Sequence, residues 1–265
     1  MITRTKRHRT GFFPICLVWI LIFSQPGFSN YYESNTKREA ALLAGGVAVT
    51  LLGTYFSSHV RPPDLSTLDP NEVPFYDRFA IRFQNKALAD VSNGLAASCI
   101  LMPFAVSVSH SKYRETDALM IAESFLYTYG ITSLCKGLFH RVRPYVYRSE
   151  EEPTRMSGYA SRSFFSRHTS MAFQGAVLAG MIYQTTHPGS RGVFPVWAAG
   201  LTCATATGVF RVLSGNHFPT DVLAGAAVGV LVGWGIPRLH EKAESEKNVP
   251  VSPSPQYVFQ VKFNF

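Results

Sequence analysis

Three short clusters of basic, hydroxyl and imidazole side chains stand out in the sequence, each beside the end of a long apolar segment. The first follows residues 118–135, the second precedes residues 169–186, and the third lies between residues 192–210 and 222–237. If each apolar segment crosses the molecule once as a helix, all three clusters meet at one end of the bundle. In chain order their members are Lys136, His140, Arg141, Arg143 and Pro144, then Ser166, Arg167 and His168, then Arg211, His217, Pro219 and Asp221.

The cations of these clusters predict a binding site for phosphate. Lys136, Arg143 and Arg211 would place three positive charges in one pocket, which is costly at the rim of an apolar bundle unless an anion lies between them. The arginine fork binds phosphate oxygens in pairs, and lysine adds a point charge. Ser166 and the backbone amides at the start of the following helix would add donors where the helix dipole favours an anion.

The two histidines predict catalysis rather than binding alone. His217 lies four residues before Asp221, so on one helical turn the carboxylate can accept the proton of one ring nitrogen and leave the other free to attack phosphorus. His168, arriving from another helix, can protonate the leaving oxygen. The predicted reaction is a two-step phosphoryl transfer through phosphohistidine, with the cations stabilising the phosphoryl oxygens.

Each of these residues also has a purely structural interpretation. Lys136 and Arg143 could be anchors at a helix end, and Asp221 could cap the helix that begins near it. A lone histidine is more often a surface group or a satisfied core group, and that interpretation is adopted for His8, His59, His110, His187 and His240. The convergence of seven such residues at helix ends favours the chemical interpretation for the clusters.

The elements that must position these clusters are apolar and long. Such segments are too long for strands, and three of them run for nineteen residues without Asp, Glu, Lys or Arg, close to the roughly 20 residues that cross a bilayer as a helix. Gly225, Gly229 and Gly233 recur four apart, a spacing that lets helices pack closely. We predict an all-α, membrane-embedded six-helix bundle with the site at one end; a buried soluble bundle is the alternative. The six segments are 40–58, 91–109, 118–135, 169–186, 192–210 and 222–237.

Composition narrows the class of protein. The chain has 265 residues, of which 46% are hydrophobic and 16% charged, and this composition disfavours a disordered protein. The net charge of +8 fits nucleic acid, an anionic membrane surface or a phosphorylated substrate. The sequence contains no CxxC pair, the spacing that would indicate zinc binding or redox chemistry. We therefore predict that the cysteines are small buried hydrophobes. They are Cys16, Cys99, Cys135 and Cys203.

The two ends of the chain differ from its middle. Residues 1–29 combine a basic start with an apolar run, which predicts a signal peptide or an N-terminal anchor. Residues 30–240 form the predicted helical phosphatase domain, in which 59–90 is a mixed-charge linker. Residues 241–265 form a tail whose last aromatic residues alternate with mostly polar ones, which is typical of a short strand.

The spacing of the clusters resembles the three-part signature of a known family. Its first part consists of Lys136 followed, after six residues, by Arg143 and Pro144. Its second part is Ser166-Arg167-His168. Its third part consists of Arg211, then His217 after five residues, then Asp221 after three more. This pattern is similar to that of the type-2 phosphatidic acid phosphatase superfamily, which includes lipid phosphate phosphatases, bacterial acid phosphatases and vanadium haloperoxidases. The resemblance covers about residues 115–238.

The resemblance implies a role for each matching position. Lys136, Arg143 and Arg211 would hold the phosphate, assisted by Ser166 and the amide of Arg167. His217 would be the nucleophile, Asp221 the group that orients it, and His168 the general acid. The resemblance also implies an all-helical fold, six membrane helices in integral members, and neither metal nor other cofactor. Three positions depart from the usual pattern: Phe165 replaces a common proline, Arg167 a common glycine, and Phe210 a common serine.

We therefore expect a membrane phosphatase acting on a lipid phosphate such as phosphatidic acid, an isoprenyl diphosphate or a phosphorylated glycolipid. Its partners would be that lipid, or a small phosphomonoester, and membrane lipid, but no nucleic acid. The expected location is a bacterial-type cell envelope with an extracytoplasmic active site. Three alternatives stay open: a soluble, exported periplasmic acid phosphatase, a non-catalytic anion-binding or transport protein, and a haloperoxidase.

Overall fold

The protein is an all-helical bundle, as predicted. The computed structural model describes residues 32–109, 114–148 and 157–242, and no β-sheet forms within them. Each predicted apolar segment falls in one long helix, whereas the expected signal segment and the expected terminal strand lie outside the described residues. The long helices are α2 (Thr36–Ser58), α4 (Lys86–Val108), α5 (Arg114–Phe139), α6 (Arg167–Thr186), α7 (Val193–Leu213) and α8 (Pro219–Leu239).

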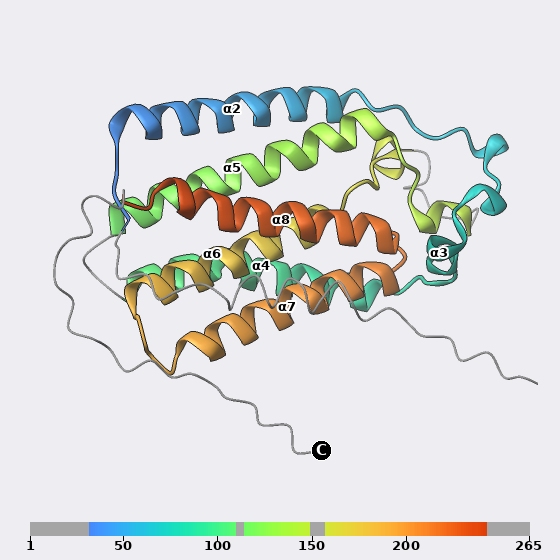
Figure 1. Cartoon of the computed structure of the whole chain (residues 1–265). Coiled ribbons are helices and arrows are strands. Elements are labelled where there is room, and N and C mark those ends of the chain that lie inside the picture. Colours follow the sequence, from blue (N-terminus) through green and yellow to red (C-terminus); the bar gives the residue numbers. More distant parts are fainter. Residues whose placement is uncertain (1–31, 110–113, 149–156, 243–265) are drawn as a thin grey trace, which may run out of the picture.

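Helix α6 forms the centre of the bundle. It packs against α4, α5, α7 and α8, whereas α2 lies on the outside and packs along α5 (Figure 1). Leu178, Ala179 and Ile182 of α6 are completely buried and belong to the core cluster that also contains Met120 of α5. Because α6 is surrounded by protein, it can carry buried polar residues such as Gln174.

The other five long helices are each long and apolar enough to cross a membrane. Their outward faces carry large apolar side chains, and Leu51, Leu101, Leu223 and Leu231 are each more than 60% exposed. A helix that is apolar on its outer face as well as its inner face is suited to lipid and not to water. These features support a multi-pass membrane protein over a soluble bundle.

The glycine stripe of α8 lets that helix lie directly on α6. A Cβ atom at Gly225 would lie 2.7 Å from the carbonyl oxygen of Ser166, and one at Gly229 would lie 2.2 Å from that of Ser170. No side chain fits such distances without a shift of the backbone. The predicted close packing at this spacing is therefore present, and it fixes α8 against the helix that begins at the second cluster.

The cysteines carry no disulfide within the described residues. Cys99 is buried and Cys135 and Cys203 are partly buried, all three as free thiols. Cys99 agrees with the prediction of a small buried hydrophobe, whereas Cys135 and Cys203 are buried only in part. Cys16 lies outside the described residues.

The alternating direction of the helices brings the chemical clusters to one end of the bundle. The end of α5, the start of α6, the end of α7 and the start of α8 lie on the right in Figure 1, beside the short helix α3 (Phe75–Arg78). Short 3₁₀ turns complete this end: η1 (Leu65–Thr67), η2 (Pro70–Glu72), η3 (Phe79–Arg82), η4 (Pro144–Tyr147) and η6 (Gly158–Ser161).

Candidate active site

A cavity of about 110 Å³ lies where the three clusters converge. Five of the eight predicted site residues line it, and two further residues come from the loop before α6. The other three predicted residues, Ser166, Arg211 and Asp221, are buried around it. The lining residues are Lys136, Arg143, Tyr159, Arg162, Arg167, His168 and His217.

His217 lies in the turn between α7 and α8, with its ring almost completely buried. The turn depends on Gly215, whose φ of 73° favours glycine and whose absent Cβ would lie 2.1 Å from the carbonyl oxygen of Phe83. His217 Nε2 lies 3.2 Å from Arg143 Nη1. Because a guanidinium can only donate, the neutral ring presents an unprotonated Nε2 to Arg143 and carries its proton on Nδ1.

Asp221 stands behind the ring, in the first turn of α8. Its Oδ2 lies 3.5 Å from His217 Nδ1, too poorly placed for a hydrogen bond. The same carboxylate accepts hydrogen bonds from the backbone N–H of Phe218 at 2.9 Å and from Ser163 Oγ at 2.5 Å. Asp221 therefore caps α8, as its structural interpretation predicted, while its negative charge faces the proton-bearing side of the ring.

A pair of residues without a predicted role holds Asp221 in place. Arg141 donates from Nη1 to Asp221 Oδ1 at 2.6 Å and from Nη2 to Asp77 Oδ2 at 2.7 Å. Asp77, on α3, is buried and also accepts from the backbone N–H and the hydroxyl of Thr220. Arg141 belongs to the first cluster of the sequence. Asp77 lies in the mixed-charge linker, and no sequence pattern there indicated that it would reach the site.

Backbone carbonyl groups hold two of the cations. Arg143 donates to the carbonyl oxygens of Tyr159, Arg162 and Asn216 at 2.9–3.1 Å, and its guanidinium lies 4.0 Å from the centre of the Tyr159 ring. Lys136 Nζ donates to the carbonyl oxygen of Arg162 at 2.8 Å. Since carbonyl groups carry no net charge, they fix both side chains without neutralising them. The positive charge remains available to an anion.

The remaining cations are held from other helices. Arg211 Nη1 donates to Ser92 Oγ and Asn93 Oδ1 of α4, both at 3.0 Å. Arg167 Nη2 donates to Ser133 Oγ of α5 at 3.0 Å, and its guanidinium lies 4.3 Å from the centre of the Tyr129 ring. These contacts join α4, α5, α6 and α7 around the cavity.

Ser166 is placed differently from the predicted phosphate donor. It is the N-cap of α6, and its Oγ accepts hydrogen bonds from the hydroxyl and the backbone N–H of Thr169 at 2.9 and 3.4 Å. Its side chain does not line the cavity. Binding of phosphate by its hydroxyl stays a prediction that would require the side chain to turn.

Sequence reasoning also missed Arg162 and Tyr159, which lie in the polar loop before α6. Arg162 donates from Nη1 to the carbonyl oxygen of Ser57 at 3.0 Å, which ties the loop to the end of α2. The only signal was the loop's position before the second cluster, and that does not identify single residues.

The cations make the cavity electropositive. Burial, followed by the charges of Arg143, Lys136 and Arg211, holds the pKa of His217 well below its usual value. Burial and the neighbouring Arg143 and Arg167 also lower the pKa of Arg162. His217 is therefore a neutral ring at physiological pH, which is the state that a nitrogen nucleophile requires.

Comparison with known proteins identifies the part of the chain that carries this site. Residues 117–245 match the family model of the PAP2 superfamily. A stretch of 129 residues is 35% identical to a lipid A 1-phosphatase of Porphyromonas gingivalis, and the match covers 48% of this chain and 24% of that protein. The chain thus spans about a quarter of the length of this curated relative.

A solved structure is also similar, that of the first transmembrane PAP2-type phosphatidylglycerolphosphate phosphatase from Bacillus subtilis. It shares 20% sequence identity and a TM-score of 0.49, over 77% of this chain and 97% of that one. The family match runs from α5 to the end of α8 and includes every predicted site residue. The part of the chain that carries the cavity, residues 117–245, is thus the part that matches the PAP2 superfamily.

Proposed function

We propose that this protein is a membrane phosphatase that removes a phosphate group from a lipid phosphomonoester or diphosphate through a phosphohistidine intermediate. The observation that carries the proposal is the position of His217. Its neutral ring presents Nε2 to the cavity beside Arg143, with a carboxylate behind its other nitrogen. A site that only binds anions needs the cations but not this arrangement.

The proposed reaction has two steps. The phosphoryl oxygens lie among Lys136, Arg143 and Arg167, with Arg211 adding charge from behind. His217 Nε2 attacks phosphorus, the bond from phosphorus to the lipid oxygen breaks, and His168 gives its proton to that oxygen. Water then attacks the phosphohistidine and gives a proton to His168, the P–N bond breaks, and inorganic phosphate leaves.

The cations serve the transition state as well as the ground state. They are fixed by carbonyl groups, serine hydroxyls and aromatic rings before substrate arrives, so no reorganisation is needed as negative charge builds on the phosphoryl oxygens. A dianionic phosphate among them would also favour the protonated imidazole of His168, because it offsets their repulsion. Substrate binding would thus supply the acid that the first step needs.

The apolar outer surface of the bundle supports a lipid as the substrate. A cavity of about 110 Å³ is suited to the phosphate group alone, so the rest of the substrate must lie outside it, at the end of helices whose outer faces suit lipid. A phosphorylated glycolipid is the first candidate, since the curated relative is a lipid A 1-phosphatase. Phosphatidic acid and isoprenyl diphosphate are the others.

The decisive experiment measures phosphate release by the detergent-solubilised parent chain and by His217→Gln on a panel of lipid and soluble phosphomonoesters. We expect the variant to lose at least about 10³-fold in kcat, because the nucleophile is gone. His59→Gln is the matched control, since this exposed histidine lies outside the cavity, and it should keep parental activity.

A second measurement separates the mechanism from the activity. Substrate labelled with ³²P should leave an acid-labile, alkali-stable label on the parent chain and none on His217→Gln. Undiminished turnover by His217→Gln would end the phosphohistidine proposal. Equal rates on soluble and lipid substrates would favour a general acid phosphatase, and phosphate binding without any release would favour an anion-binding protein.

A further inference from the structure

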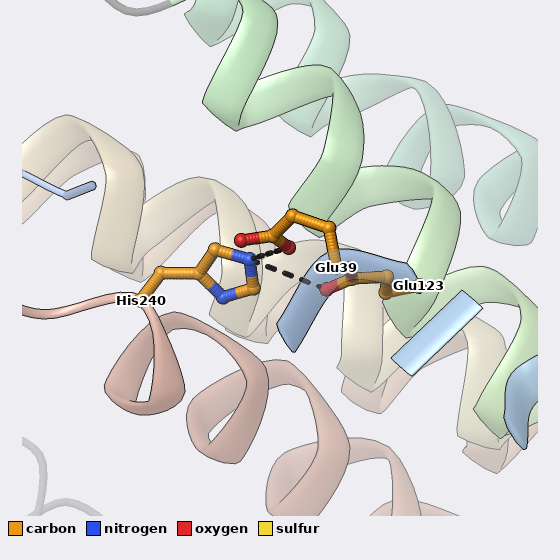
Figure 2. A group of neighbouring side chains, drawn as sticks. All are labelled: Glu39, Glu123 and His240. Atoms are coloured by element: carbon orange, nitrogen blue, oxygen red, sulfur yellow. Dashed lines mark hydrogen bonds and ion pairs between the residues drawn. The ribbon is translucent and has the colours of Figure 1, made fainter. Parts of the chain in front are cut away.

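Three buried ionisable side chains meet at the end of the bundle opposite the phosphate site. Glu39 comes from the first turn of α2, Glu123 from α5, and His240 directly follows α8. Figure 2 shows the three side chains pointing toward one another. His240 Nε2 lies 2.7 Å from Glu39 Oε2 and 3.4 Å from Glu123 Oε2. All three are at most 5% exposed.

Glu123 lacks the partners that a buried carboxylate needs. It is completely buried, and among the described residues neither of its oxygens accepts a hydrogen bond. A buried charge without hydrogen bonds is costly unless a cation compensates it. The nearest candidate is the ring of His240, at a distance longer than a good charge-assisted hydrogen bond.

In the neutral tautomer of His240 that carries its proton on Nδ1, the lone pair of Nε2 faces both carboxylates. Its Nδ1 lies 2.9 Å from the carbonyl oxygen of Ile236, which can only accept, so Nδ1 carries a proton. In the neutral ring Nε2 is then an acceptor that faces two other acceptors. A metal ion between them removes this conflict. Histidine ligands of metals usually donate their other N–H to a carbonyl or carboxylate, as His240 does.

Glu39 is also prepared as a ligand. Its Oε1 accepts from the backbone N–H of Asn35 at 3.0 Å and from Arg38 Nη2 at 2.7 Å. These bonds orient the carboxylate and leave Oε2 pointing at His240. Supporting hydrogen bonds of this kind are typical of metal-binding carboxylates.

We propose that Glu39, Glu123 and His240 bind a divalent cation of the zinc or manganese class. Nitrogen and carboxylate ligands suit these ions, and with bonds of roughly 2.0–2.2 Å neighbouring ligand atoms lie about 3 Å apart. The observed separations of 2.7 and 3.4 Å bracket that value, and all three candidate ligand atoms lie within 4.8 Å of one another. Water would complete the coordination.

The role of this ion is structural. α8 has 21 residues, so its two ends lie about 30 Å apart, and the ion cannot take part in chemistry at His217. It would join the start of α2 to α5 and to the end of α8. Helix α2 otherwise packs mainly along α5, so a metal crosslink would hold the outermost helix against the bundle.

The test uses the full chain, purified in detergent with a tag that contains no histidine. After treatment with chelator, Zn²⁺ or Mn²⁺ is added back, and bound metal and melting temperature are measured. We expect one equivalent per chain and a metal-dependent rise of the melting temperature. Glu123→Gln should weaken metal binding at least about 100-fold and abolish that rise. Glu115→Gln, an exposed change on the same helix, should behave as the parent.

Other outcomes would overturn the proposal. If the parent binds no more metal than Glu123→Gln and melts at the same temperature with and without metal, the cluster is a proton-bridged ion pair. The metal titration of the parent decides the question by itself if the variant does not fold. Neither readout depends on phosphatase activity, so the result is independent of the proposed function.

Discussion

At the scale of single residues, the site depends on one neutral ring in a positive environment. His217 is buried, donates its backbone N–H to the carbonyl oxygen of Arg211, and meets Arg143 with Nε2. Burial and neighbouring cations together disfavour its charged form, which lowers its pKa. The same features that suit the ring to the proposed role of nucleophile therefore make it resist protonation.

This resistance predicts how stability depends on pH. A lowered pKa means that the unfolded chain takes up a proton near pH 6.5 that the folded chain does not, so stability falls as the pH drops below that value. The loss is at most about 1.4 kcal/mol per pH unit. We expect the melting temperature to fall more steeply between pH 6.5 and 5 in the parent than in His217→Gln. Parallel curves would contradict the assignment.

At the scale of elements, α8 places Asp221 behind the ring of His217, and contacts fix both the first turn and the side of this helix. Arg141 and Asp77 hold its first turn, and its glycine residues pack directly against the backbone of α6. A small shift of α8 would move Asp221 relative to His217. The two features can be tested separately, since one lies at the start of the helix and the other along its side.

Asp77 is predicted to act as a positioning residue. Asp77→Asn removes a charge-assisted bond to Arg141 and should lower kcat about tenfold, which corresponds to about 1.4 kcal/mol. Inhibition by inorganic phosphate should change less than about twofold, because Asp77 does not line the cavity. Glu72→Gln, an exposed change in the preceding turn, is the control. An equal loss of phosphate affinity would show that Asp77 shapes the cavity itself.

We predict that the contact between α8 and α6 tolerates no Cβ atom at Gly229. In Gly229→Ala the new methyl group would lie 2.2 Å from the carbonyl oxygen of Ser170, so the helices must separate. We expect a melting temperature lower by several degrees and reduced activity. Gly235→Ala lies on the same helix with nothing within 4 Å, and should be neutral or slightly stabilising. Equal behaviour of the two variants would refute the close packing.

At the scale of the whole molecule, four of the five helices suited to a bilayer pack around α6, and α2 packs on the outside of α5. The two ends of this bundle have different chemistry. One end holds the cationic cavity and the other the Glu39, Glu123 and His240 cluster. We propose that the cavity end faces the extracytoplasmic side of a bacterial-type envelope. Because α2 begins at the opposite end of the bundle, this orientation requires the start of α2 to lie on the cytoplasmic side.

This orientation is tested by labelling of intact cells with an impermeant thiol reagent. Glu72→Cys is exposed at the cavity end, and Pro188→Cys is exposed at the opposite end, between α6 and α7. We expect labelling above the parent level at residue 72 only. The reverse pattern would place the site in the cytoplasm, and release of the protein from lysed cells without detergent would contradict membrane embedding.

The sequence by itself determined the fold class and the convergence of the site. Apolar runs of helical length are local signals, and the alternating direction of successive helices brings the ends of α5 and α7 beside the starts of α6 and α8. Lys136, Arg143, Arg167, His168 and His217 thus reach one cavity, as their positions in the chain predicted.

Only the tertiary structure decided which side chains support these groups. Asp77 meets Arg141, Ser166 caps its own helix, and His240 meets Glu39 across 201 residues of sequence. Such partners depend on the rotation and tilt of each helix, which are set by contacts such as that of Gly229 with Ser170. No local pattern records them, because they arise only when the helices pack together.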